Sequence, residues 1–329
     1  MSQKSLLEAE VEQIDLVEVQ PRATDLLRLS DFSPEQVKHV LDLAAAMKLN
    51  PAGWVDRFQA RSVGCIFEKP STRTRVSTSV AAHRLGMQCL ELPSGQMQLS
   101  RGETIGDTGR VLSEYLDLIV IRTYEQQRVA ALAAAASVPV INALSNDHHP
   151  LQGLADLLTL REQFGSLGGL KLAFVGDACG NICHSLLEAA ALTGMTMVIA
   201  TPERYRPDPA VLAVARRIAK RTGATIEIVT DPEEAVRDAD AVYPEIWVPM
   251  DGESARKQRI AELSAYQVNA KLMALSSPGS VFMHCLPAYR EQEVTSEVLD
   301  GPRSVVWQQA GNRLHTCQAV MRTLLLGED

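Results

Sequence analysis

Residues 171–193 read KLAFVGDACGNICHSLLEAAALT, and this stretch decides the fold class. It opens with the apolar run Lys171–Gly176, passes through a short polar turn and continues as the helical segment Ile182–Thr193. A strand that enters a helix through a short turn is the repeating unit of a parallel sheet. The stretch is therefore typical of an α/β protein.

The same alternation of apolar runs and helical segments extends along most of the chain. The other runs that we expect to form strands are Ser62–Phe67, Gln88–Leu92, Leu118–Arg122, Val138–Leu144, Thr196–Thr201, Thr225–Thr230, Ala241–Glu245, Val281–Leu286 and Val305–Gln308. The segments that we expect to be helical include Arg73–Leu85, Thr104–Tyr115, Leu151–Phe164, Pro209–Arg221 and Asn312–Leu326. This order predicts doubly wound parallel sheets covered by helices on both faces.

The chain is long enough for two domains, since 329 residues are about twice the roughly 150 of an average domain. The helical segment Leu151–Phe164 is followed by GSLGG at 165–169, after which a new series of strands and helices begins. We therefore predict two α/β domains joined at this helix, one over residues 25–155 and one over 156–311. The C-terminal helix, within residues 312–329, is expected to pack back on the first domain.

Composition indicates a globular chain without a nucleic-acid or membrane partner. Hydrophobic residues make up 46%, charged residues 22%, and the formal net charge is −8. No apolar run approaches the roughly 20 residues that a bilayer requires, and no long basic run appears. Residues 1–24 form an acidic lead-in without the basic start and apolar middle of a signal peptide. The 6 cysteines lack the spacing of a metal or disulfide framework, so we expect reduced thiols in the cytoplasm.

Residues 67–75, FEKPSTRTR, follow a predicted strand and open a predicted helix. Backbone N–H groups at a helix N-terminus lack partners inside the helix, and the helix dipole favours negative charge there. Ser71, Thr72 and Thr74 add hydroxyls, and Arg73 adds a guanidinium fork suited to phosphate oxygens. The stretch therefore indicates a phosphate site, although a Ser cap followed by two solvated arginines would leave the same pattern.

Two further strand ends carry polar side chains. Arg122 ends the apolar run Leu118–Ile121, a place where a lone arginine is often part of a surface ion pair. His149 and Gln152 stand three residues apart at the start of a helical segment and share one helix face. The neighbouring His148 does not make this a metal site, because a third ligand at matching spacing is missing. We expect no metal.

Two other strand ends suggest chemistry that the sequence does not support. Cys285 ends a predicted strand, but His284 points to the opposite face by alternation, so no base stands beside the thiol and we do not expect covalent catalysis. The turn Val175–Asn181 resembles a dinucleotide loop, yet it lacks the G-x-G-x-x-G spacing. We therefore expect no nucleotide cofactor, and no other cofactor either.

Five motifs together resemble one family. They are Ser71-Thr72-Arg73-Thr74-Arg75, Arg101-Gly102-Glu103-Thr104, His149-Pro150-Leu151-Gln152, His284-Cys285-Leu286-Pro287 and Asn312-Arg313-Leu314-His315. In order and spacing, from about residue 25 to the end, the chain is similar to the ornithine carbamoyltransferase family of the aspartate/ornithine carbamoyltransferase superfamily. The resemblance implies that family's fold of two parallel-sheet domains joined by hinge helices, the first binding carbamoyl phosphate and the second the amino acid.

The resemblance also implies roles for single residues around carbamoyl phosphate. Its implied contacts are Ser71, Thr72, Arg73, Thr74 and Arg122 for the phosphate, Arg122 and Arg313 for the carbonyl oxygen, His149, Gln152, Cys285 and Leu286 for the carbamoyl group, and Gln98 for the phosphate site of a neighbouring subunit. The catalytic candidates are Arg122, His149, Cys285 and Arg313. Shared sites imply a homotrimer or a multiple of trimers.

The side that would bind ornithine departs from the family pattern. Asn181 matches the position that grips the α-carboxylate, and Cys285 and Leu286 match positions beside the reacting amine. The family pattern Asp-x-Trp-x-Ser-Met-Gly is here EIWVPMD at 245–251, so that Glu245 and Pro249 replace Asp and Ser beside Met250. Glu245 retains the charge for the α-ammonium, whereas Pro249 removes a hydroxyl and a backbone donor.

The function implied by the resemblance is transfer of a carbamoyl group from carbamoyl phosphate to L-ornithine, giving L-citrulline and phosphate, as in arginine metabolism. Three alternatives stay open. The acceptor could be another amine, because the second-substrate loop is altered. The chain could be a weakened paralogue that binds carbamoyl phosphate as a regulatory subunit, or an oxidoreductase that uses the glycine turn.

Overall fold

The computed structural model describes residues 25–248 and 256–326, and its chain divides into two compact units. Unit 1 comprises the described residues up to Leu158 together with those from Asn312 onward, and unit 2 comprises the described residues between Thr159 and Gly311. Two helices, α6 (Pro150–Phe164) and α13 (Val306–Leu325), contribute residues to both units. The expected lead-in at 1–24 lies outside the described residues.

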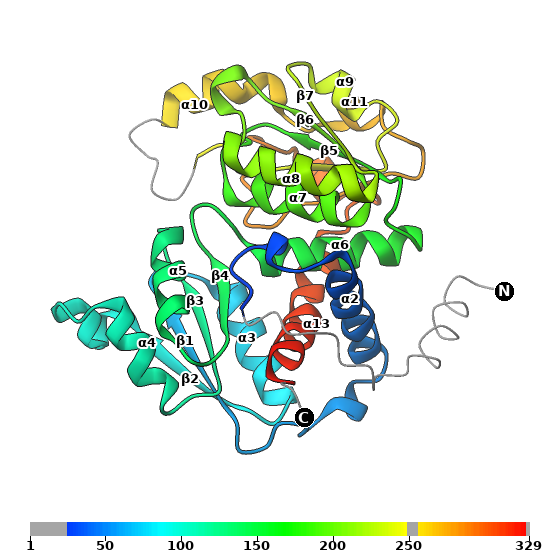
Figure 1. Cartoon of the computed structure of the whole chain (residues 1–329). Helices are drawn as coiled ribbons and strands as arrows, with labels where there is room; N and C mark the ends of the chain where they lie inside the picture. Colours follow the sequence, from blue (N-terminus) through cyan, green and yellow to red (C-terminus); the bar gives the residue numbers. More distant parts are fainter. Residues whose placement is uncertain (1–24, 249–255, 327–329) are drawn as a thin grey trace. The chain divides into compact units, whose positions relative to one another are not determined.

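Unit 1 contains a four-stranded parallel sheet with the strand order β2-β1-β3-β4 (Figure 1). Its strands are β1 (Ser62–Phe67), β2 (Gln88–Pro93), β3 (Leu118–Arg122) and β4 (Val140–Leu144), and its helices include α2 (Pro34–Leu49), α3 (Thr72–Arg84), α4 (Ile105–Ser113) and α5 (Gln126–Ala135). On one face Ile66, Ile119 and Ile121 form a buried cluster with Val129 and Leu132 of α5. The alternate residues of β1 and β3 point to the other face and are buried too, so these two central strands are covered on both sides, whereas no residue of the edge strand β2 is fully buried.

Unit 2 contains a five-stranded parallel sheet with the order β7-β6-β5-β8-β9. Its strands are β5 (Lys171–Val175), β6 (Thr196–Ala200), β7 (Thr225–Val229), β8 (Ala241–Pro244) and β9 (Val281–Phe282), and its helices include α7 (Asn181–Thr193), α8 (Pro209–Thr222), α9 (Pro232–Val236), α10 (Arg256–Leu263), α11 (Ala270–Met273) and α12 (Ser296–Leu299). In Figure 1, α7 and α8 lie on one face of this sheet and α9 on the other. The predicted α/β class with two parallel sheets is confirmed.

The expected strand Val305–Gln308 is wrong. Phe282 of β9 donates its amide to Arg303 O (2.8 Å) and accepts from Val305 N (3.0 Å), so the chain touches the sheet edge there. It then turns helical at once, and α13 begins ahead of the expected start at Asn312. Adjacent valines favoured a strand, but the glutamines and alanine that follow have higher helix propensity, and the helix prevails.

Candidate active site

The carboxyl ends of β1, β3 and β4 meet at one edge of the unit 1 sheet. Phe67 at the end of β1 is level with Arg122 at the end of β3, and Arg122 is level with Leu144 at the end of β4. The register between β3 and β4 shifts at Arg122, and irregularities of this kind re-aim a side chain. The loops that leave these strands carry the phosphate candidates, Arg122 and His149, so parallel pairing brings them to the same edge.

Helix α3 opens on the phosphate candidates. Ser71 is its N-cap, and the Ser71 hydroxyl accepts a hydrogen bond from Thr74 N at 3.1 Å. The Thr74 side chain is fully buried, Arg73 is half-buried and Thr72 is exposed. The Ser cap considered as an alternative is therefore present. One N–H of the first helical turn, that of Thr74, is thus already bonded by the cap.

Arg313 of α13, far along the sequence, contacts the start of α3, where the predicted phosphate residues lie. Its Nη2 donates to Thr74 Oγ1 at 2.7 Å, and Arg313 is only 5% exposed. A buried charge requires such a partner, since desolvation is costly without one. Two predicted site residues, 239 positions apart, are thus in direct contact within unit 1.

His149 lies among three guanidinium groups. The side chain is buried, and burial lowers the pKa of the imidazole well below its usual value, helped by the charges of Arg313, Arg122 and Arg73. His149 is therefore neutral near pH 7, a form in which one ring nitrogen donates and the other accepts. Gln152, on the first turn of α6, is also buried and donates its amide Nε2 to Asp156 Oδ1 at 2.8 Å.

Glu68 ties the loop after β1 to the loop after β3, and sequence reasoning missed it. Its backbone N donates to Arg122 O at 2.9 Å. Its carboxylate accepts from the Thr123 hydroxyl and from Arg128, whose Nη2 lies at 2.8 Å. Glu68 lies within the stretch 67–75 predicted to bind phosphate, but nothing in the local pattern indicated a partner as distant as Arg128.

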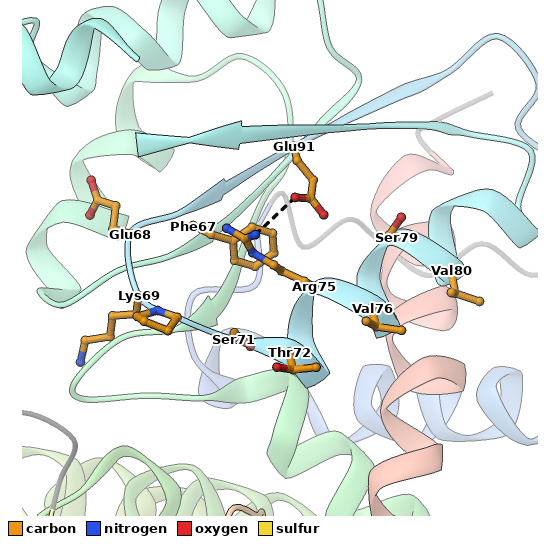
Figure 2. Close-up of a pocket in the computed structure, with 11 residues that line it drawn as sticks. Phe67, Glu68, Lys69, Ser71, Thr72, Arg75, Val76, Ser79, Val80 and Glu91 are labelled. Carbon is orange, nitrogen blue, oxygen red and sulfur yellow. Dashed lines mark ion pairs between the residues drawn. The ribbon is translucent and has the colours of Figure 1, made fainter. Parts of the chain in front are cut away.

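A cavity of about 780 Å³ lies beside the start of α3 (Figure 2). Ser71 and Thr72 line it, together with Arg75, which stacks over Phe67 with the guanidinium 5.1 Å from the ring centroid. Arg75 also pairs with Glu91 at 3.5 Å, as the dashed line in Figure 2 marks. The cavity thus offers hydroxyls and a partly neutralised cation next to the phosphate loop.

Gln98 is exposed in the short helix η4 (Gln98–Arg101) and does not belong to the lining of this cavity.

In unit 2, the predicted acceptor residues also follow strand ends. Glu245 follows β8, and its carboxylate accepts from the Cys285 thiol, with Oε1 3.7 Å from Sγ. Leu286, next to this thiol, has the left-handed backbone angle φ +57°. Asn181 is the first residue of α7, after the turn that leaves β5, and is half-buried. Pro249 and Met250 lie outside the described residues.

His284 supports the turn that carries Cys285 and Leu286. Its Nδ1 accepts a hydrogen bond from Leu286 N at 2.9 Å, and its Nε2 lies 3.4 Å from the carboxylate of Glu293. The His284 amide donates to Gln309 Oε1 at 2.9 Å. These contacts use the imidazole to hold the backbone of the turn.

Over residues 25–248 and 256–326, no group of histidine, cysteine and carboxylate side chains is arranged to hold a metal ion. In the same ranges, no helix combines the length and apolar character needed to cross a bilayer.

Comparison with protein families matches both halves of the chain. The model described as the aspartate/ornithine carbamoyltransferase carbamoyl-P binding domain matches residues 24–162, and the one described as the Asp/Orn binding domain of the same family matches 168–324. A Hyperthermus butylicus protein named ornithine carbamoyltransferase is 49% identical over 304 residues, or 92% of this chain and 97% of its own. A relative of the same name from Listeria monocytogenes serotype 4a is 45% identical over 302 residues, or 92% and 95%.

Solved structures agree along nearly the whole chain. Ornithine carbamoyltransferase from Pyrococcus furiosus superposes with a TM-score of 0.89 at 44% identity, covering 93% of this chain and 98% of its own. The enzyme of that name from Gloeobacter violaceus gives 0.84 at 43% identity, covering 93% and 100%. Both units therefore share their folds with these proteins.

Proposed function

The chain belongs to the aspartate/ornithine carbamoyltransferase family, and from this premise we propose that it transfers the carbamoyl group of carbamoyl phosphate to the side-chain amine of L-ornithine. The products are L-citrulline and phosphate. The observation that carries the proposal is the contact of Arg313 with Thr74 beside a buried, neutral His149. These groups form a set of fixed donors of the kind that a carbonyl oxygen and a phosphate require.

Unit 1 is assigned to carbamoyl phosphate. The assigned contacts are Ser71, Thr72, Arg73, Thr74 and Arg122 for the phosphate, Arg122 and Arg313 for the carbonyl oxygen, and His149 and Gln152 for the carbamoyl group. A neutral His149 can donate one N–H to the carbonyl oxygen. Each fixed donor to a developing oxyanion is worth about 3 kcal/mol of barrier, so Arg122 and His149 are the catalytic candidates with the largest expected effect.

The chemical step requires little covalent work from the protein. The amine nitrogen attacks the carbamoyl carbon, and the carbonyl π electrons move onto oxygen. The oxygen then returns its electron pair and the C=O bond re-forms, while the C–O bond to phosphate breaks. Phosphate leaves with the electron pair of the broken bond and takes the proton that the nitrogen loses. Holding two reactants in place can contribute roughly 7–11 kcal/mol, so positioning carries most of the catalysis.

Unit 2 is assigned to the amino acid. Asn181 grips the α-carboxylate, Glu245 pairs with the α-ammonium, and Cys285 with Leu286 contacts the reacting amine and the carbamoyl nitrogen. Pro249 and Met250 are included among the ornithine contacts because of their positions in the sequence motif 245–251. The 3.7 Å contact of Glu245 with Cys285 supports it, because it places a carboxylate beside the turn that carries the thiol.

One observation favours a second candidate, a carbamoyltransferase with another amine acceptor. A glutamate stands where the family pattern has an aspartate, and its longer side chain reaches the Cys285 thiol. The α-ammonium would then be held at a different place, so an acceptor whose reacting amine lies at a different distance from it would reach the carbamoyl carbon. A modified ornithine, a diamine or a specialised-metabolism amino acid would be candidates.

The proposed assembly is a homotrimer in the cytoplasm, serving arginine biosynthesis. The trimer is supported by an apolar side chain that is exposed in the single chain: Val76 lines the cavity beside the start of α3 and is 57% exposed. The exposed position of Gln98 suits a residue that reaches a neighbouring copy. Size measurement in solution tests the trimer directly.

The test of function is an acceptor panel with purified protein and carbamoyl phosphate. We expect citrulline from ornithine, detected by mass spectrometry, at a rate well above that of 2,4-diaminobutyrate, lysine, putrescine and N-acetylornithine. A blank without protein corrects for cyanate released by carbamoyl phosphate. Consumption of other amines with ornithine untouched would refute the proposal in favour of the second candidate.

A further inference from the structure

Arg259 of α10 joins three separate segments of unit 2. Its Nη2 donates to the carboxylate of Asp177 in the turn between β5 and α7, and its Nε donates to the carbonyl oxygen of Trp247 at 2.5 Å. The guanidinium also lies over Tyr205, 4.8 Å from the ring centroid. Two hydrogen bonds and a ring contact therefore fix the position of the guanidinium. The guanidinium in turn holds the three segments together.

Asp177 shapes the turn that leads to Asn181. One carboxylate oxygen of Asp177 accepts from Cys179 N at 3.0 Å, while the other accepts from the guanidinium. Trp247 packs on the same turn, because a Cβ on Gly176, whose φ is +115°, would lie 3.5 Å from the indole Nε1. The turn and the Trp247 segment are thus held together by packing and by hydrogen bonds.

We propose that Arg259 is a positioning residue that sets specificity for the acceptor amino acid. Glu245 stands two residues before Trp247, and Asn181 follows the turn shaped by Asp177, so the guanidinium fixes how Glu245 and Asn181 lie relative to each other. Together these two residues would hold the α-carbon of the acceptor, and the place of that carbon decides which side-chain length brings the amine to the carbamoyl carbon. The inference rests on the proposed function, in which these two residues hold the α-ammonium and the α-carboxylate. In this role Arg259 acts through its neighbours and does not contact the substrate.

The role requires an arginine and not merely a cation. A guanidinium presents several N–H groups in a rigid plane, so it can bond a carboxylate and a carbonyl while it stacks on a ring. Lysine would keep the charge beside Asp177 but would lose the second bond and the stack. Burial raises the pKa of Asp177, and the Arg259 charge opposes that effect, so removal of the guanidinium leaves a buried acid without its counter-ion.

The experiment compares Arg259→Met and Arg259→Lys with the control Arg206→Lys, all in the full chain. Arg206 is an exposed arginine of the same unit, paired with Glu203 at 2.7 Å. Steady-state kinetics give KM for ornithine, KM for carbamoyl phosphate and kcat, and urea unfolding reports the fold. A second readout is the ratio of kcat/KM for ornithine to that for 2,4-diaminobutyrate, which a loss of overall stability would not move.

We expect Arg259→Met to raise KM for ornithine about a hundredfold and Arg259→Lys about tenfold, since one charge-assisted hydrogen bond is worth roughly a decade. The ratio of kcat/KM for ornithine to that for 2,4-diaminobutyrate falls in both variants, while KM for carbamoyl phosphate stays at the wild-type value. All kinetic constants of the control Arg206→Lys stay at wild-type values. Should both variants fail to fold, Asp177→Asn replaces them, because it keeps the side-chain shape. We expect it too to raise KM for ornithine and to lower the same ratio of kcat/KM values.

A folded Arg259→Lys, or in its place a folded Asp177→Asn, with unmoved KM for ornithine and unmoved selectivity overturns this inference alone. An equal rise of both KM values overturns it too, because positioning of one substrate must separate them. Wild-type protein that turns over no ornithine overturns the proposed function, and this inference with it.

Discussion

The two units present their candidate residues in different ways. In unit 1 a short motif at a helix N-terminus supplies most of the groups, and Arg313 and His149 close around it. In unit 2 the candidates stand on separate segments, Glu245 after β8 and Asn181 at the start of α7, and the contact of Arg259 with Asp177 and Trp247 connects these segments. An anion can be held by local donors at one helix end, whereas the two charged groups on the α-carbon of an amino acid require two residues from separate segments to be held at a fixed position relative to each other. If unit 2 binds the acceptor as proposed, residues outside the contacts themselves, such as Arg259, are expected to matter more there than in unit 1.

The largest effect is expected where unit 1 stabilises charge in the transition state. Arg122→Met should lower kcat/KM about 10²–10³-fold, or roughly 2.7–4 kcal/mol, because a fixed donor to the oxyanion is lost. Steady-state kinetics with both substrates varied should show the loss in kcat and in KM for carbamoyl phosphate. A change confined to KM for ornithine would break the division of labour between the units.

A smaller loss is expected from the contact that closes the unit 1 site. Thr74→Val removes the hydroxyl that accepts from Arg313 and leaves a buried guanidinium without that bond, at a cost of about 1.5–3 kcal/mol. We expect kcat/KM for carbamoyl phosphate to fall tenfold to a hundredfold. The control is Thr72→Val, at an exposed position of the same helical turn, which should lower kcat/KM clearly less. Equal losses of kcat/KM in the two variants would contradict the importance of the buried contact.

The depressed pKa of His149, a residue of unit 1, predicts that the free energy of unfolding depends on pH. Because the folded-state pKa lies below the unfolded value of about 6.5, stability is full above that pH and is lost as pH falls through it. Between pH 6.5 and 5.5 the unfolding free energy should drop roughly 1 kcal/mol more in wild type than in His149→Gln. Urea unfolding at both values measures the difference, and parallel curves would show that His149 is not held neutral.

The smallest effect is expected from shortening the acceptor grip of unit 2. Glu245→Asp keeps the charge and restores the family residue, so KM for ornithine should change by less than about tenfold, equivalent to 1.4 kcal/mol. KM for carbamoyl phosphate should stay constant. A large gain in ornithine turnover would mean that Glu245 adapts the wild-type site to another amine.

The α/β class and most of the strands could be predicted because each leaves a local pattern, although the strand expected over Val281–Leu286 covers only Val281–Phe282. The phosphate site at the start of α3 remains a prediction. The run Val305–Gln308 could not be predicted, since its pair of valines resembles a strand and only the following residues and the sheet edge favour the helix. The contacts of Arg313 with Thr74 and of Arg259 with Asp177 join residues far apart in sequence. No period or spacing in one sequence encodes such pairs, so only the folded chain reveals them.

The most direct test is calorimetric titration of carbamoyl phosphate into the wild-type protein and Arg73→Gln at low ionic strength. Arg73 is half-buried, and its charge contributes to the lowered pKa of His149, so its loss should weaken the anion site. We expect saturable binding by the wild type and at least about tenfold weaker binding by the variant, since charge-assisted hydrogen bonds are lost. No binding by the wild type, or equal affinity in the variant, would contradict a phosphate cradle at the start of α3.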